Sequence, residues 1–303
     1  MEEDVGATVV RVGHGDGGCR AGTRGLWWRG HPAATPAPGG STASPGSPSA
    51  GSGDGTASSR WVPRPGTDWQ WQLSGRVDLS PDVPVYDVDG QETSAATVAA
   101  LHARGRHVVC YVNVGAWEDF RPDRAAFAPA LRGRPLDGWP DERWLDIRRL
   151  SALEPLIAAR FDECRRKGFD AVEPDNVDGY ANDSGFPLTA ADQLSFNRMV
   201  ARLAHDRGLS VALKNDLDQV PQLVRDFDFA VVEQCAQYDE CGRTLPFLRA
   251  GKAVLEVEYV DVDGQGSGGA AGADPASRCR AAKRLGLSAM RKTLDLTAWR
   301  APC

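Results

Sequence analysis

Two acidic segments, each at the end of an apolar run, are the strongest chemical signal in this 303-residue chain. The first, residues 169–180, has the sequence FDAVEPDNVDGY, and the second, residues 227–235, has the sequence FDFAVVEQC. If both runs are strands of one α/β barrel, their carboxyl ends meet on the face that carries the chemistry. Two carboxylates that meet there could cleave a glycosidic bond. Asp175 and Glu233 are therefore the candidate catalytic pair.

Polar and aromatic residues follow the other predicted strands, and we expect them to surround this pair. The predicted substrate-binding set is Asp87, Asp89, Asn113, Trp117, Asn176, Asp178, Tyr180, Lys214, Asp216, Gln234, Tyr238 and Glu258. Its aromatic members, together with Trp139 and Trp144, could stack on sugar rings, because aromatic planes offer apolar contact to a sugar face. A single acid at a strand end can also cap a helix or pair with Lys214, so the set as a whole carries the prediction.

Lys214 leaves two chemical hypotheses open. Beside several acids it is expected to be an ion-pair partner that tunes a carboxylate. A lysine at a strand end can instead form a Schiff base, which makes aldolase chemistry a competing hypothesis. The chain has no metal-binding histidine motif, no Ser or Cys nucleophile motif, no GxGxxG and no P-loop. We therefore expect neither a metal nor a cofactor.

The elements that must position these residues repeat along residues 61–303. Five predicted helices end with a basic residue and a glycine before an apolar strand, which suits the negative end of a helix and its left-handed last residue. Eight strands are predicted, over residues 69–73, 83–88, 107–113, 170–175, 209–215, 228–233, 253–258 and 288–292. The predicted fold class is α/β, a (β/α)8 TIM-type barrel. The long segment 114–149 is expected to be an elaborated loop over the active face.

The first sixty residues differ from the rest in composition. Residues 33–60 are dominated by Pro, Ala, Gly, Ser and Thr, which predicts a disordered tail, 1–60, ahead of a hydrolase domain, 61–303. Untranslated or mis-framed upstream sequence is the alternative. No signal peptide is visible in residues 1–24, which predicts either a cytoplasmic protein or a wrongly assigned start.

Cysteine use and charge limit the compartment and the partners. Cys110 and Cys164 are expected to be buried thiols, whereas Cys235, Cys241, Cys279 and Cys303 could form two disulfides in an exported protein. The formal net charge of −6 argues against nucleic acid and anionic membranes. No apolar run approaches the roughly 20 residues that span a bilayer. We expect a monomer.

Several segments, taken in order, resemble glycoside hydrolase family 114. They are Trp69-Gln-Trp-Gln-Leu, Tyr86-Asp-Val-Asp, Trp117-Glu-Asp, Trp144-Leu-Asp-Ile, Glu173-Pro-Asp-Asn-Val-Asp-Gly-Tyr, Gly185-Phe-Pro-Leu-Thr, Leu213-Lys-Asn-Asp and Glu233-Gln-Cys. The resemblance covers about residues 61–303. It implies a TIM-type barrel that hydrolyses α-1,4-linked polygalactosamine, an exopolysaccharide, by endo-cleavage. A carbohydrate-binding barrel without catalysis is the alternative.

The resemblance also implies roles for individual residues. In the family the catalytic acids follow strands four and six, which here are the positions of Asp175, as nucleophile, and Glu233, as general acid/base. A retaining mechanism is expected. De-N-acetylated galactosamine carries an ammonium group, which the acids Asp87, Asp89, Asp178, Asp216 and Glu258 would attract. An extracellular or cell-surface location is implied as well.

Overall fold

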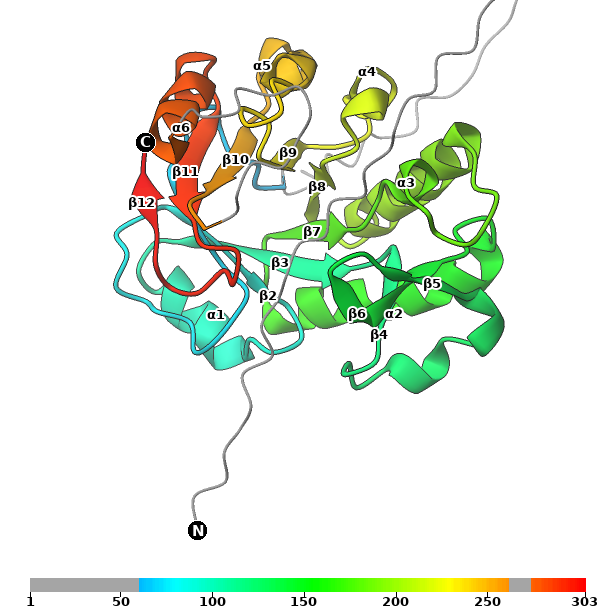
Figure 1. The fold of residues 1–303 in the computed structure, drawn as a ribbon. Coiled ribbons are helices and arrows are strands. Elements are labelled where there is room, and N and C mark those ends of the chain that lie inside the picture. Colours follow the sequence, from blue (N-terminus) through cyan, green and yellow to red (C-terminus); the bar gives the residue numbers. More distant parts are fainter. Residues whose placement is uncertain (1–59, 262–273) are drawn as a thin grey trace, which may run out of the picture. The chain divides into compact units, whose positions relative to one another are not determined.

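A curled parallel sheet with helices on its outer side forms the part of the chain that the computed structural model describes, residues 60–261 and 274–303 (Figure 1). Residues 1–59 of the predicted tail, 1–60, lie outside the described residues. The α/β, TIM-type fold class predicted from the sequence is confirmed.

Eight parallel strands correspond one by one to the eight predicted strands. They are β1 (Trp69–Gln72), β2 (Val85–Asp89), β3 (His107–Asn113), β7 (Ala171–Asp175), β8 (Ser210–Lys214), β9 (Phe229–Glu233), β10 (Val254–Tyr259) and β11 (Ser288–Lys292). Neighbours in the sheet follow chain order, and each pairing is parallel. All eight carboxyl ends therefore lie at the same edge of the sheet, as a barrel active face requires.

Helices cover the outer face of this sheet (Figure 1). They are α1 (Ala95–His102), α2 (Leu150–Lys167), α3 (Ala190–His205), α4 (Val220–Leu223), α5 (Leu245–Arg249) and α6 (Pro275–Arg284), with single 3₁₀ turns η1 (Arg124–Ala126), η2 (Pro129–Leu131), η3 (Gly179–Ala181), η4 (Leu217–Gln219) and η5 (Cys241–Thr244). The predicted helix ends are found at two helices. Helix α2 ends at Gly168, whose φ of 94° is left-handed, and α3 begins at a capping box of Thr189 and Asp192.

Two apolar layers lie on the two faces of the sheet. The outer layer packs strands against helices, for example Val172 of β7 against the helix residues Ile157 and Phe196. The inner layer contains Trp69, Trp71 and Phe229. Successive side chains of a strand alternate between faces. On β7 this alternation turns Glu173 and Asp175 to the same face as the inner-layer residue Ala171.

The seam between β1 and β11 is filled by the segment that follows β11. In the described residues no strand ladder joins β1 to β11 directly; instead residues 293–302 run between them and end in β12 (Ala301–Pro302), which pairs antiparallel with β11. The backbone N–H of Leu73 donates to the carbonyl of Leu296 at 3.0 Å. The side-chain amide of Gln70 donates to the carbonyl of Ala298 at 2.7 Å. The predicted barrel is thus completed by side-chain and loop contacts.

The predicted loop over residues 114–149 contains a small antiparallel sheet of its own. Its strands are β4 (Ala116–Glu118), β5 (Arg132–Leu136) and β6 (Trp139–Leu145), in the order β4-β6-β5. Ala116, Leu136 and Trp144 form its buried centre. The sequence prediction treated this segment as a loop and missed these strands, whose β5–β6 ladder shifts register twice.

The structure contains three disulfides, Cys110–Cys164, Cys235–Cys241 and Cys279–Cys303. The last two agree with the prediction of two disulfides among four cysteines. The prediction that Cys110 and Cys164 are free buried thiols is wrong. Cys110 lies on β3 and Cys164 on α2, so the bond links a strand to a helix that covers the sheet. Their separation of 54 residues gives no local sign of this packing.

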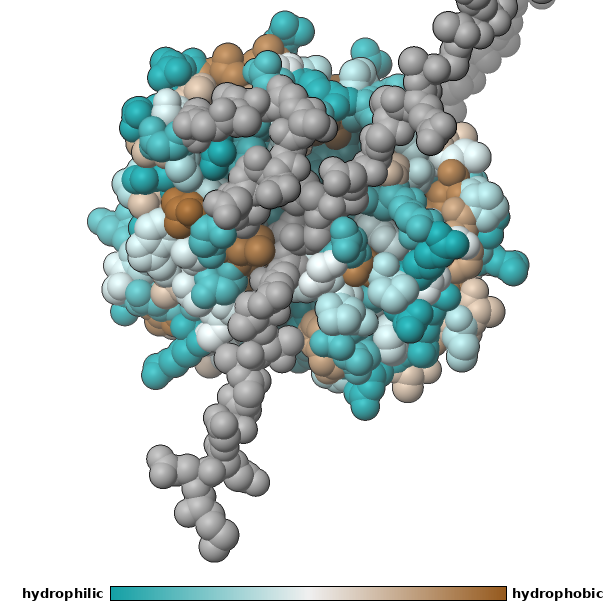
Figure 2. Space-filling model, in the orientation of Figure 1, coloured by the Kyte–Doolittle hydropathy of each residue, from teal (hydrophilic) through white to brown (hydrophobic). Residues whose placement is uncertain are grey.

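The surface in view is mainly hydrophilic, and its hydrophobic residues lie in small separate patches (Figure 2). Large exposed hydrophobic side chains in the described residues are few and scattered, and include Phe120, Leu285 and Trp299. Within the described ranges, no helix combines the length and the hydropathy needed to cross a membrane.

Candidate active site

Three adjacent strands each end in a charged residue. These residues are Asp175 on β7, Lys214 on β8 and Glu233 on β9. The next residue in each case has a left-handed backbone, at Asn176 (φ 60°), Asn215 (φ 48°) and Gln234 (φ 56°). Such a conformation is unfavourable for residues other than glycine and cannot continue a strand. Each strand therefore stops directly after its charged residue, at the same edge of the sheet.

Lys214 lies between the two candidate catalytic carboxylates. Its Nζ is 3.1 Å from Asp175 Oδ1 and 3.3 Å from Glu233 Oε2. The two oxygens are therefore at most about 6.4 Å apart, the sum of these distances. A third carboxylate, Glu173, approaches the same Nζ to 3.0 Å, and the ring centroid of Trp71 is 4.7 Å away. The structure thus brings together the acids that the sequence analysis selected.

Each candidate acid also accepts a hydrogen bond from a tyrosine. Tyr111 donates to Asp175 Oδ2 at 2.7 Å, and Tyr259 donates to Glu233 Oε1 at 2.6 Å. Burial raises the pKa of both phenols well above their usual value, and the neighbouring acids add to the shift. Both tyrosines therefore stay protonated at neutral pH and act as fixed donors. Asn215 adds a third donor, from Nδ2 to Glu233 Oε2 at 3.1 Å.

Exposure distinguishes the two acids from the lysine. The side chain of Asp175 is 19% exposed, that of Glu233 is 7% exposed and that of Lys214 is 3% exposed. Burial opposes the charged form of Lys214, but the charges of Asp175, Glu173 and Glu233 outweigh it and raise the pKa of the ammonium group. Lys214 is therefore a permanent cation below the two acids.

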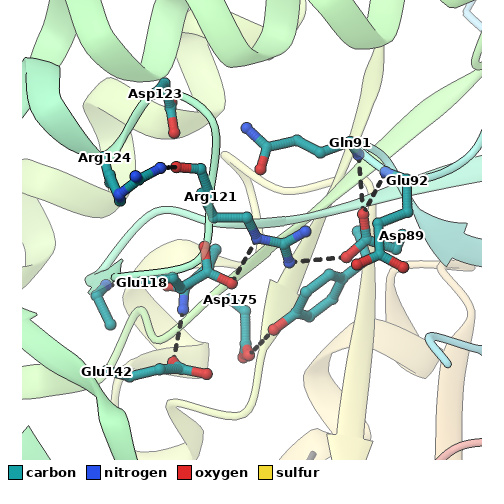
Figure 3. A network of polar contacts seen from close by, with 12 residues as sticks. Asp89, Gln91, Glu92, Glu118, Arg121, Asp123, Arg124, Glu142 and Asp175 are labelled. Carbon is teal, nitrogen blue, oxygen red and sulfur yellow. Dashed lines mark hydrogen bonds and ion pairs between the residues drawn. The ribbon is translucent and has the colours of Figure 1, made fainter. Parts of the chain in front are cut away.

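A second charged network connects Asp89, at the end of β2, to Glu118 of β4 in the inserted sheet through Arg121 (Figure 3). Arg121 donates to Glu118 at 2.8 Å and to Asp89 at 2.7 Å. Asn113, at the end of β3, donates to Glu142 of β6 at 2.9 Å. Burial raises the pKa of Glu142 to about 9, and the charges of Glu118 and Asp175 contribute. Glu142 is therefore a neutral acid at physiological pH.

Asp178, Tyr180 and Asp216 form an acidic group beyond the end of β7. Burial and the charge of Asp175 raise the pKa of Asp178 to about 6. Burial and the charge of Asp178 raise the pKa of Asp216 to about 8, whereas hydrogen bonds from Tyr180 and Asn197 oppose the shift. Asp178 thus responds to the charge of Asp175, and Asp216 responds to the charge of Asp178.

Other predicted substrate-binding acids lie covered by protein. Asp87 and Glu258 are fully buried, and Asp89 is buried against Arg121. Glu258 accepts hydrogen bonds from the backbone of Ala236 and Gln237, in the loop after β9, and pairs with Arg278 of α6 at 3.0 Å. A direct contact between these three acids and a sugar would require rearrangement of their present partners.

The remaining predicted residues occupy varied positions. Trp117 is half-buried, its Nε1 donates to the carbonyl of Arg124, and the guanidinium of Arg132 lies 4.2 Å from its ring centroid. One face of this ring is therefore already covered. Gln234 is fully buried, and Tyr238 is half-buried in the loop after β9.

Sequence reasoning gave no role to four residues that the structure places beside the pair, which are Tyr111, Tyr259, Asn215 and Glu173. The alternation of side chains along a strand could have identified two of them as facing the site. Glu173 lies two residues before Asp175 and Tyr111 two residues before Asn113, so each shares a face with a residue that was selected. Within residues 60–261 and 274–303 no cluster of His, Cys, Asp and Glu could hold a metal ion.

The fold and the match to a glycoside hydrolase profile define a TIM-type glycoside hydrolase. The sequence profile of glycoside hydrolase family GH114 matches residues 53–303, which is most of the chain. The chain belongs to family GH114.

Solved structures agree with this assignment. Ega3 from Aspergillus fumigatus, solved in complex with galactosamine, is 37% identical, with a TM-score of 0.76 over 82% of this chain and 100% of that chain. The glycoside hydrolase domain of PelA from Pseudomonas aeruginosa is 14% identical, with a TM-score of 0.57 over 75% of this chain and 96% of that chain, and shares the fold. No curated protein sequence matches this chain.

Proposed function

We propose that this glycoside hydrolase is an endo-acting enzyme that cleaves α-1,4-linked polygalactosamine. The observation that carries the proposal is the position of Asp175 and Glu233 on either side of Lys214, with oxygens at most about 6.4 Å apart. A sugar-sized gap between two carboxylates is what hydrolysis of a glycosidic bond requires. Similarity to Ega3, which was solved with galactosamine, supports the choice of sugar.

The proposed mechanism is retaining. Retaining enzymes hold their two carboxyl groups about 5–5.5 Å apart, whereas inverting enzymes leave roughly 6.5–9.5 Å for a water molecule. The bound of 6.4 Å between Asp175 Oδ1 and Glu233 Oε2 supports the shorter class. Asp175 attacks the anomeric carbon while Glu233 gives its proton to the leaving oxygen. Glu233 then takes a proton from water, which attacks the same carbon and releases Asp175.

The supporting groups suit these roles. Lys214 and the phenol of Tyr111 each donate a hydrogen bond to Asp175 and hold its carboxyl group in place. Tyr259 and Asn215 fix the orientation of the Glu233 carboxyl group. Orientation of this kind lowers the barrier because the acid is already placed when the bond begins to break.

A cationic amino sugar suits the charge around the pair. Asp178 feels the charge of Asp175 and provides a carboxylate that could receive an ammonium group, whereas Asp216 is buried and accepts a hydrogen bond from Asn197. An ammonium ion would favour the ionised form of Asp178 and so be bound more tightly as this group loses its proton. We therefore propose a preference for deacetylated polymer over fully acetylated polymer.

Two other functions are less well supported. A Schiff-base lysine must lose its proton to attack a carbonyl, whereas the three carboxylates around Lys214 raise the pKa of its ammonium group. A carbohydrate-binding barrel without catalysis does not account for the convergence of two acids and two tyrosine donors. We also propose export from the cytosol, since three disulfides are typical of proteins in oxidising compartments.

Incubation with α-1,4-polygalactosamine tests the proposal. Wild type should release oligomers early, as endo-cleavage does, while Asp175→Asn and Glu233→Gln should each lose at least about 100-fold in rate. Asp162→Asn, which removes a mostly exposed carboxylate on α2, is the matched control and should keep wild-type activity. Proton NMR of the first product gives the stereochemistry. Release of single sugars only, or unchanged activity in both variants, would contradict the proposal.

A further inference from the structure

A pair of fully buried acids lies on the inner side of the sheet, next to Lys214. Asp87 of β2 and Glu173 of β7 each have a solvent exposure of 0%. Lys214 reaches Glu173 Oε1 at 3.0 Å, and no N–H or O–H group in the described residues donates a hydrogen bond to either oxygen of Asp87. A buried carboxylate without donors is strongly unfavourable, so at least one of these groups must be neutral.

Asp87 and Glu173 lie close enough that each shifts the pKa of the other, and any hydrogen bond between two carboxyl groups requires one of them to carry a proton. The charged groups that face Asp87 are Glu173, Lys214 and Asp175. Burial raises the pKa of Asp87 well above its usual range, and the charge of Glu173 adds to this. Glu173 differs because it alone contacts Lys214, whose charge favours the ionised form. The proton therefore belongs on Asp87.

We propose that Asp87 is kept as a neutral acid that donates to Glu173, and that Glu173 in turn holds Lys214 between Asp175 and Glu233. Asp87 and Glu173 are thus positioning residues for the catalytic pair. The role attributed to Lys214 rests on the proposed hydrolase function, whereas the proton on Asp87 does not.

The proposal explains why one lysine can serve two acids with different tasks. Lys214 has three donor hydrogens and three carboxylate neighbours, one of which, Glu173, lies deepest and is fixed by Asp87. This deep contact keeps the ammonium from moving entirely to Asp175 or to Glu233. It also supplies a negative charge that offsets part of the lysine charge acting on the catalytic pair.

Infrared difference spectroscopy tests the proton directly. At neutral pH the wild-type spectrum minus that of Asp87→Asn should contain the carbonyl stretch of a protonated carboxylic acid, which an ionised carboxylate lacks. The same band should persist in Glu173→Gln. Its absence from the wild-type difference spectrum would overturn the assignment, whatever the enzyme hydrolyses.

The pH dependence of kcat tests the positioning role. Glu173→Gln removes a negative charge next to Lys214, so the alkaline limb of the profile should move to lower pH. Asp87→Asn removes no charge and should leave the limb in place. Asp87→Leu cannot donate and should lose about tenfold in kcat, most of which Asp87→Asn restores. A limb that moves equally in Asp87→Asn and Glu173→Gln would refute a neutral Asp87.

Discussion

Two regions of the molecule neutralise buried acids in different ways. One is the Lys214 cluster at the ends of β7, β8 and β9, and the other is the Arg121 network beside the inserted sheet. Arg121 donates one hydrogen bond to Glu118 and one to Asp89 from two different nitrogens, and the neighbouring Arg160 pairs with Asp123 through two bonds. Lys214 meets three carboxylates with one flexible ammonium group.

The difference reflects the chemistry of the two cations. A guanidinium presents donors in a rigid plane, which suits a structural joint, whereas an ammonium is a point charge whose donors can turn. In the proposed reaction the charge on the carboxyl groups beside Lys214 changes. An ammonium group can rotate its N–H donors to follow that change. At Arg121 the partners, Asp89 and Glu118, are buried and need not change.

The largest expected effect follows from removing the lysine. Lys214→Met leaves Glu173, Asp175 and Glu233 without their cation, so the protein should lose about 3–5 kcal/mol of stability at neutral pH and at least about 100-fold in hydrolysis rate. The stability loss should shrink as the pH falls, because burial raises the pKa of Glu173 and this carboxylate gains a proton early. Urea unfolding at neutral and at acidic pH measures this.

Lys283→Met removes an exposed lysine on α6 and is the control for this change. It should leave both stability and rate unchanged. If Lys214→Met unfolded at the wild-type urea concentration, the lysine would not be neutralising the cluster.

A smaller effect is expected from exchanging the cation type in the other network. Arg121→Lys keeps the charge but cannot reach Glu118 and Asp89 together, so about 1–3 kcal/mol of stability should be lost. The alkaline limb of the activity profile should stay in place, because the catalytic acids keep their neighbours. A shift of the alkaline limb in Arg121→Lys would show that the Arg121 network and the Lys214 cluster are electrostatically coupled.

Replacing Glu142 should change how the stability of the protein depends on pH, by a smaller amount than the changes above. Its pKa is raised to about 9 in the folded protein, against about 4.3 in the unfolded chain. The folded state then binds more protons between these values, so stability falls as the pH rises through this window. Glu142→Gln should reduce that fall between about pH 5 and pH 9 by more than about 1.4 kcal/mol, the value of one pKa unit. Parallel stability curves would contradict it.

The smallest effect is expected at the rim of the inserted sheet. Arg134 and Asp183 form an ion pair in which the two side chains are 62% and 79% exposed. Exposed pairs of this kind contribute little, so Asp183→Asn should unfold within about 0.5 kcal/mol of wild type. A loss comparable to that in Arg121→Lys would mean that exposure does not separate the two kinds of pair.

The sequence predicted the helices and strands better than the side-chain contacts between them. The eight strands and the ends of β7 and β9 follow from hydrophobic runs and helix-end signals, which are local. Burial of Asp87 and Glu258 was not predicted, because a strand-end acid has the same sequence signature whether it faces solvent or another acid. The bond between Cys110 and Cys164 was missed for the same reason, since it depends on how α2 packs against β3.

The seam between β1 and β11 has a consequence for how the protein is made. Leu73 and Gln70 near the start of the fold find their backbone partners at Leu296 and Ala298, which are synthesised more than two hundred residues later. While the ribosome is still translating, strands β7 to β9 can assemble. The barrel cannot close until residues 293–302 are available to contact β1. A chain that stops at residue 292 should therefore expose the edge of β1 and be captured by chaperones, even though every proposed catalytic residue is already present.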